Sequence, residues 1–140
     1  MFSDDMKFLQ KAVVFHPSGN GKFLAIKRSP EAHARPGDWD LAGGNVLFGE
    51  LHEDALRREI REESGLEVGA LMPTQVVTSF TDETYYLYIN YSTRALSASV
   101  SLSEEHTEYK WVSQDEFTAL RPAQFLLDSV ALATRAQSLM

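Results

Sequence analysis

The sequence predicts an α+β fold in which helices pack on a mixed β-sheet. Segments rich in β-branched and aromatic residues outnumber the amphipathic helical segments, and the two kinds do not alternate one for one along the chain. The chain has 140 residues, a length typical of one domain that buries about two-thirds of its unfolded surface. We therefore expect residues 1–140 to form a single domain.

The β-rich segments predict six strands, at residues 7–16, 22–28, 39–41, 74–81, 84–95 and 108–112. Pro17 to Gly21 separates the first two strands, which predicts a β-hairpin, and Asp82-Glu83 marks a turn between the fourth and fifth. The third strand leads into a loop with the paired glycines Gly43 and Gly44. Without side chains, this loop could approach a ligand closely.

Three segments predict helices, at residues 51–64, 113–120 and 122–138. In the first, Leu56 and Ile60 form an apolar stripe one turn apart, and Gly65 is a natural C-terminal stop. The second opens with a capping box, in which a serine is followed three residues later by a glutamate. Pro122 can occupy the first position of the last helix, where a missing N–H costs nothing.

Composition limits the partners of the chain. The net charge of −7 disfavours a nucleic-acid backbone or an anionic membrane as the main partner. No segment approaches 18 consecutive apolar residues, the length that a membrane-spanning helix needs. The chain has no cysteine, which excludes disulfides and thiolate chemistry and fits a reducing compartment. We therefore expect a cytoplasmic protein with no membrane partner, and the charge disfavours nucleic acid as its main partner.

Three glutamates gather on one face of the first predicted helix. At 3.6 residues per turn, Glu59 shares a face with Glu62 and Glu63, and like charges at these spacings destabilise a helix by roughly 0.2–0.5 kcal/mol per pair. Clustered carboxylates offer oxygen donors alone, which suit Mg²⁺ or Mn²⁺, and Mg²⁺ commonly bridges carboxylates to substrate phosphates. The cluster therefore predicts a divalent cation and phosphate chemistry.

Residues 44–66 fill every fixed position of the pattern G-x5-E-x7-R-E-U-x-E-E-x-G-U, where U is aliphatic. This pattern resembles the Nudix box, the signature of hydrolases that cleave nucleoside diphosphates linked to another moiety. The order of strands and helices also follows this family over most of the chain, and the resemblance implies the Nudix fold, an α/β/α sandwich around a mixed sheet. One departure is Ala42, where many members have proline; it removes no ligand.

The resemblance also implies roles for individual residues. The expected metal ligands are the carbonyl of Gly43 and the carboxylates of Glu59, Glu62 and Glu63. Arg58 is expected to orient the catalytic Glu59, and Glu50 to pair with Arg58. Gly44 and Gly65 are expected to be structural.

Family members commonly draw a further carboxylate from a loop outside the box, as a base or an extra ligand. The segment before the last strand offers Glu105, which we favour, with Glu108 and Glu104 behind it. His33 and His106 are expected to be surface loop residues. The basic residues Lys27, Arg28 and Arg35, upstream of the glycine loop, could meet distal phosphates.

These expectations converge on a hydrolase that uses Mg²⁺ or Mn²⁺ to cleave a phosphoanhydride bond in a small-molecule nucleoside diphosphate derivative. The candidate substrates are nucleoside triphosphates, nucleotide sugars and ADP-ribose, and a homodimer is a possible assembly. Two alternatives stay open, a non-catalytic Nudix domain that senses nucleotides and an enzyme that removes pyrophosphate from RNA 5′ ends. An isomerase acting on isopentenyl diphosphate would be expected to use a cysteine, which this chain lacks.

Overall fold

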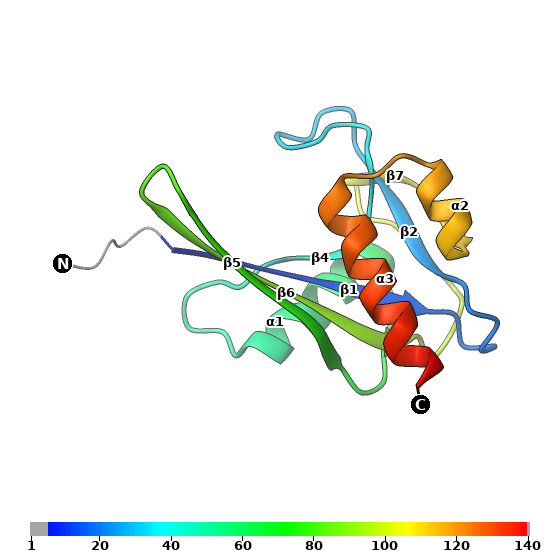
Figure 1. The fold of residues 1–140 in the computed structure, drawn as a ribbon. Coiled ribbons are helices and arrows are strands. Elements are labelled where there is room, and N and C mark those ends of the chain that lie inside the picture. The colour runs from blue at the N-terminus through cyan, green and yellow to red at the C-terminus, as the bar shows by residue number, and fades with distance from the viewer. Residues whose placement is uncertain (1–5, 140) are drawn as a thin grey trace.

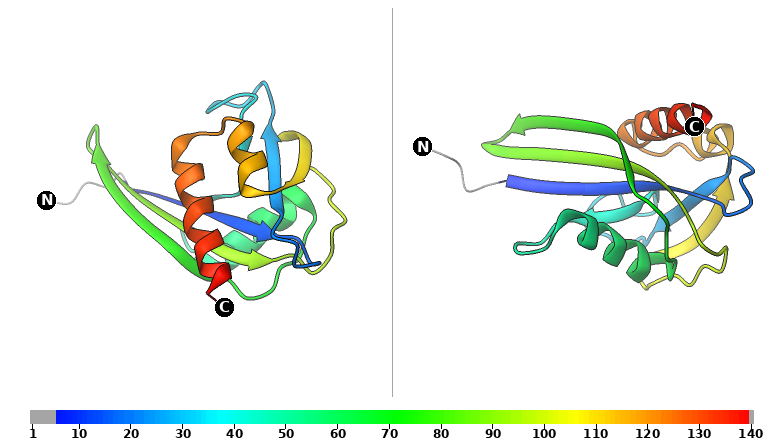
Figure 2. Two further views of the ribbon diagram at one scale, coloured as in Figure 1. Left: turned by 45° about the vertical axis from the view of Figure 1, so that its right-hand side comes forward. Right: turned by 90° about the horizontal axis from the view of Figure 1, so that it is seen from below.

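The computed structural model describes residues 6–139 and shows helices on both faces of a β-sheet (Figures 1 and 2). The strands are β1 (Met6–Phe15), β2 (Phe23–Arg28), β3 (Trp39–Asp40), β4 (Ala42–Asn45), β5 (Met72–Thr81), β6 (Thr84–Arg94) and β7 (His106–Val112). The helices are α1 (His52–Ser64), α2 (Gln114–Ala119) and α3 (Gln124–Ser138). The predicted α+β class is confirmed.

The sheet is mixed, as predicted. Its main path runs β3-β2-β1-β6-β5, with β4 paired to β1 and β7 paired to β2. The long strand β1 runs parallel to β6 over ten residue pairs, from Met6↔Tyr85 to Phe15↔Arg94. The other strand pairs are antiparallel. The central strand β1 thus connects the two halves of the sheet.

The predicted hairpin of the first two strands is present only at its turn. β1 and β2 share one residue pair, Phe15↔Phe23, because beyond it β1 pairs with β4 and β6 while β2 pairs with β7. The glycine segment predicted as a loop is the strand β4. Gly43 makes this pairing possible, because a Cβ there would overlap the Gln10 carbonyl oxygen of β1.

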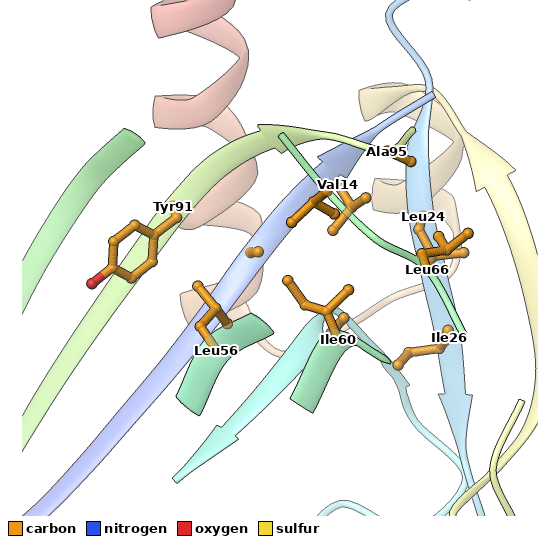
Figure 3. Packing of buried hydrophobic residues seen from close by; sticks show 11 residues of the cluster. Val14, Leu24, Ile26, Leu56, Ile60, Leu66, Tyr91 and Ala95 are labelled. Atoms are coloured by element: carbon orange, nitrogen blue, oxygen red, sulfur yellow. The ribbon is translucent and has the colours of Figure 1, made fainter. Parts of the chain in front are cut away.

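Two hydrophobic cores flank the sheet because side chains alternate along β1. Ala12 and Val14 face α1 and pack in a cluster with Leu56 and Ile60 (Figure 3). Val13, on the opposite face, packs in a second cluster, whose helical members are Phe117, Leu126, Val130 and Ala133 of α2 and α3. Each face of the sheet is therefore covered by helix, with α1 and α3 on opposite sides in Figure 2.

The helix ends differ in part from the predictions. Gly65 ends α1 in the left-handed conformation, and the predicted capping box of Ser113 and Glu116 opens α2. The last helix begins at Gln124 with Ala123 as its N-cap, so the prediction of Pro122 as its first residue was wrong. None of the described helices is long and apolar enough to cross a membrane.

Candidate active site

The acidic face of α1 lies against the glycine strand β4. A Cβ built on Gly44 would come within 2.7 Å of the Glu59 carboxyl carbon, so only glycine lets this carboxyl group rest on the strand backbone. Burial raises the pKa of Glu59, against the lowering effect of Arg58, and the nearby charges of Glu62 and Glu105 raise it further. The carboxyl group of Glu59 is therefore crowded by other acids.

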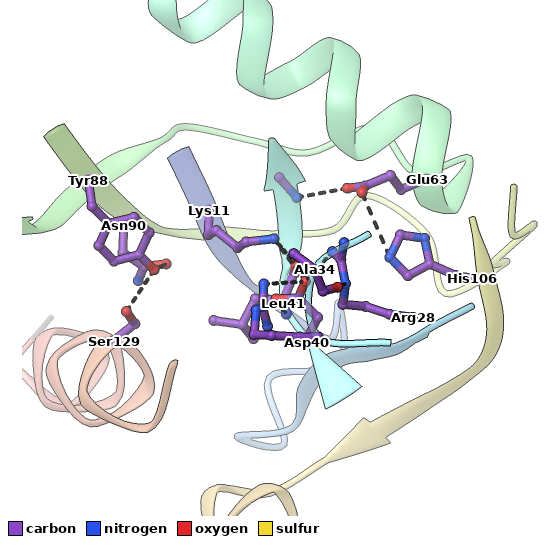
Figure 4. A network of polar contacts seen from close by, with 12 residues as sticks. Lys11, Arg28, Ala34, Asp40, Leu41, Glu63, Tyr88, Asn90, His106 and Ser129 are labelled. Atoms are coloured by element: carbon purple, nitrogen blue, oxygen red, sulfur yellow. Dashed lines mark hydrogen bonds and ion pairs between the residues drawn. The ribbon is translucent and has the colours of Figure 1, made fainter. Parts of the chain in front are cut away.

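Glu63 is buried between α1 and β4. Its side-chain Oε1 accepts a hydrogen bond of 2.7 Å from the backbone N–H of Gly43 (Figure 4). Burial raises the pKa of the Glu63 carboxyl to about 8, although the charge of Lys11 and the Gly43 N–H both act to lower it. A buried carboxyl group avoids the cost of an uncompensated charge either by keeping its proton or by gaining a cation nearby.

Arg58 links the box glutamates to the loop before α1. Its Nε and Nη2 donate to the two carboxylate oxygens of Glu50, at 2.7 and 2.9 Å, and its Nη1 donates to Glu59 at 3.0 Å and to Glu62 at 3.1 Å. The hydrogen bonds from Arg58 lower the pKa of Glu50, and those to Glu50 raise the pKa of Arg58. The bidentate pair fixes the plane of the guanidinium group that contacts Glu59.

We predict that Glu50→Gln lowers turnover by about 10-fold or more, the typical cost of losing a partner that orients a ligand. Arg58 would lose the fixed orientation through which it holds Glu59. The matched control is Glu67→Gln, because Glu67 makes a similar two-point pair with Arg61 on the exposed side of the same helix. Steady-state kinetics and thermal unfolding would be compared, and an equal loss of turnover in both variants would contradict a positioning role for Glu50.

A cavity of about 440 Å³ lies beside the acidic cluster. Its lining residues are Arg28, Ser29, Glu31, Ala32, His33, Ala34, Glu104, Glu105 and His106. Glu105 is exposed at this cavity and its charge acts on Glu59. Glu108, the second candidate for an outer carboxylate, instead pairs with Lys27 at 3.6 Å. Glu105 therefore lies where its charge reaches Glu59, whereas Glu108 has Lys27 as its partner.

His106 is a buried residue at the start of β7, so the prediction of a surface position was wrong; His33 is exposed, as predicted. The His106 ring is 2% exposed, and its Nε2 lies 3.8 Å from Oε2 of Glu63 (Figure 4). Neither ring nitrogen has a hydrogen-bond partner within residues 6–139. Burial lowers the pKa of His106 to about 4. The sequence around His106 does not indicate this burial, because the preceding residue Glu105 is charged and exposed.

A second polar cluster, which the sequence did not predict, lies beneath the glycine strand. The fully buried Asp40 accepts from Lys11 and Arg28, both at 3.0 Å, and from Arg35 at 3.2 Å (Figure 4). Burial alone would raise the pKa of Asp40, but Lys11 and Arg35 lower it to about 2. Arg28 and Arg35 are therefore occupied by Asp40, which argues against the expectation that they bind distal phosphates.

The box carboxylates are arranged around Arg58 and the Gly43 N–H rather than around a common point. Accordingly, no group of three or more His, Asp or Glu side chains in the described part of the chain is close enough together to hold a metal ion. The donor set still fits Mg²⁺ or Mn²⁺, because Glu59, Glu62 and Glu63 supply only oxygen and lie within one helical turn. Arg58 bonds only Oε1 of Glu59 and only Oε2 of Glu62, so the second oxygen of each carboxylate lies outside these bonds.

Comparisons with known proteins agree with this geometry. The family model described as the NUDIX domain matches residues 9–131. The chain is 34% identical over 112 residues to the nucleoside triphosphatase NudI of Enterobacter sp. (strain 638), covering 72% of this chain and 79% of that protein. It is 32% identical over 111 residues to NudI of Escherichia coli O17:K52:H18 (strain UMN026 / ExPEC), covering 69% and 77%.

Solved structures share the fold over nearly the whole chain. The MutT protein from Methanosarcina mazei Go1 has a TM-score of 0.79 at 26% identity, covering 97% of this chain and 98% of that one. A C. elegans Ap4A hydrolase has a TM-score of 0.77 at 17% identity, covering 96% and 99%, and shows the likeness of fold alone. The sandwich of helices around the mixed sheet is the Nudix fold. The chain therefore belongs to the NUDIX family and is a Nudix hydrolase.

Proposed function

We propose that this enzyme hydrolyses a phosphoanhydride bond of a nucleoside triphosphate and requires Mg²⁺ or Mn²⁺. The observation that carries the proposal is the packing of Glu59 on Gly44 and of Glu63 on the Gly43 N–H, which holds two box carboxylates at one strand. The choice of a triphosphate rests on the NudI relatives, which are named as nucleoside triphosphatases. Nucleotide sugars and ADP-ribose are the competing substrates.

The residues that would hold the metal are Glu59, Glu62, Glu63 and the carbonyl of Gly43. A divalent cation bound there would supply the charge that screens the phosphates, polarises phosphorus and lowers the pKa of a water molecule. Beside such a charge, Glu59, Glu62 and Glu63 would repel one another less, and burial of the Glu63 carboxylate would cost less.

The protein residues position the ligands and move the proton. Arg58, held by Glu50, keeps the Glu59 carboxylate in place against Gly44. Glu105 is exposed at the cavity, and its negative charge raises the pKa of Glu59. Glu105 would accept the proton of the attacking water. The cavity beside Glu105 is large enough to hold part of a nucleotide.

A substrate panel tests this proposal. Nucleoside triphosphates, nucleotide sugars and ADP-ribose would be incubated with Mg²⁺, with Mn²⁺ and with a chelator, and the products resolved to show which phosphorus is attacked. We expect the highest kcat/KM for a nucleoside triphosphate and no turnover with the chelator. Turnover that persists in the chelator would overturn the metal requirement, and a preference for a sugar or ADP-ribose derivative would overturn the substrate.

We predict that Glu105→Gln lowers turnover by about 10²–10⁴-fold, the range for loss of a general base, and removes the acidic limb of the pH–rate profile. The matched control is Glu31→Gln, since Glu31 lines the same cavity and is not a candidate for the base. An unchanged pH–rate profile in Glu105→Gln would exclude Glu105 as the base. Glu108→Gln and Glu104→Gln would then be tested in its place.

We also propose that the enzyme works in the cytoplasm. A chain without cysteine is compatible with a reducing compartment. Fractionation of the source cells with an antibody against this protein would test the location, and recovery outside the cytoplasmic fraction would contradict it.

A further inference from the structure

The paired strands β5 and β6 extend beyond the helices as an arm, which we define as residues 76–88 (Figures 1 and 2). Helix α3 supports only the base of this arm, where Ser129 Oγ donates to Oε1 of Gln75 at 2.7 Å. From Val76 to Thr81 every residue of β5 is exposed. Within residues 6–139, neither a helix nor a hydrophobic core covers this half of the strand.

The outer edge of β5 is open and carries no charge. β5 pairs with β6 alone among the described strands, and the sheet path ends at β5. Natural edge strands are usually blocked by charged residues, by proline or by bulges. Here Pro73 and a bulge between Pro73 and Gln75 protect only the start, because residues 75–81 (QVVTSFT) contain no charged residue. An unprotected edge of this kind is suited to pairing with another strand.

Apolar side chains are exposed on both faces of the arm. Val76 and Phe80, each 64% exposed, lie on the same face of the sheet as Ile89, and Ile89 packs against the hydrophobic core under α1. Val77, 43% exposed, lies on the other face, opposite Tyr88, which contacts Ser129 of α3. A partner that continues the sheet would bury both sets together.

We propose that the partner is a second copy of this chain, paired through antiparallel β5 strands with a two-fold axis at Thr78. In this register Val76 of each copy lies opposite Phe80 of the other, and the two Thr78 residues face each other. Aromatic with β-branched pairs and threonine pairs are both favourable across strands. Residues 75–81 are thus self-complementary, which a symmetric two-fold interface requires.

Charge selects the antiparallel arrangement. The turn at the tip of each arm carries Asp82 and Glu83. Parallel pairing would place the two acidic tips side by side, whereas antiparallel pairing places them at opposite ends of the interface. Since each copy has a net charge of −7, an uncharged edge is also where two copies meet with the least repulsion.

Sedimentation equilibrium over a series of concentrations tests the interface. We expect the wild type to sediment with twice the mass of one chain, and the double variant Val76→Lys/Phe80→Lys to sediment as a monomer with its fold retained by circular dichroism. The control is Leu96→Lys, because Leu96 is 68% exposed beyond the opposite end of β6. A monomeric wild type, or a dimer that survives the double variant, would overturn the proposal.

Cysteine cross-linking tests the register, since the chain contains no cysteine of its own. Directly opposed residues of antiparallel strands have Cα atoms about 4.5–5.5 Å apart, within disulfide range, so Thr78→Cys should give a cross-linked dimer under mild oxidation. Val77→Cys is the control, because the two copies of residue 77 would be diagonal neighbours at about 7–8 Å. Faster cross-linking from Val77→Cys than from Thr78→Cys would overturn this register.

Discussion

Glu59→Gln is expected to remove most of the turnover while the fold stays intact. The glutamine keeps the shape of the side chain against Gly44 but carries no charge for a cation or for Arg58. The loss should exceed the roughly 10–100-fold that follows when a metal site loses an outer partner, because Glu59 is proposed as a ligand itself. kcat at saturating Mg²⁺ and the affinity for Mn²⁺, measured by calorimetry, would both be determined.

Glu53→Gln is the matched control for this experiment. Glu53 is an exposed acid in the first turn of the same helix and occupies a variable position of the box pattern. Its replacement should change the free energy of unfolding by no more than about 0.5 kcal/mol and leave turnover unchanged. Near-normal turnover of Glu59→Gln would remove Glu59 from the active site, whatever its affinity for Mn²⁺.

The two neighbouring glycines are expected to respond differently to alanine. In Gly44→Ala the three atoms nearest to the new Cβ would all belong to the carboxyl end of the flexible Glu59 side chain, so the fold should tolerate the change while the carboxylate moves. A shift of about 1 Å in a catalytic group can cost about 10²-fold in rate, and we expect a loss of turnover of that size. The thermal midpoint should stay close to that of the wild type.

In Gly43→Ala the Cβ would overlap the backbone of β1 at Gln10, and Gly43 has a φ of 145° that other residues rarely adopt. The free energy of unfolding should fall by on the order of 3 kcal/mol. Chemical denaturation of both variants, with turnover measured below each transition, separates the two effects. Loss of stability in Gly44→Ala with normal turnover would contradict the contact with Glu59.

The parts of the site that lie within one helix could be predicted from the sequence. The spacing of Glu59, Glu62 and Glu63 fixes their shared face because helical periodicity is local. The same holds for the buried stripe of Leu56 and Ile60. The alternation and composition of the strands likewise gave their approximate limits and the α+β class.

The parts that depend on contacts distant in sequence could not be predicted. The pairing of the glycine segment with β1 joins residues 30 to 36 positions apart, and glycine in itself favours a loop. The burial of His106 beside Glu63 depends on the pairing of β2 with β7. The cluster around Asp40 depends on the pairing of β2 with β3. No periodicity in the sequence specifies which strands become neighbours.

The bonds of Arg58 to Glu50, Glu59 and Glu62 have a consequence for the protein without the metal ion proposed above. The guanidinium group already neutralises part of the acidic cluster, so α1 does not need a divalent ion in order to fold. The proposed metal ion would then bind beside Arg58 at a helix that is already formed, and its binding would not be a folding event. Chelated protein should therefore recover full activity as soon as the ion is returned.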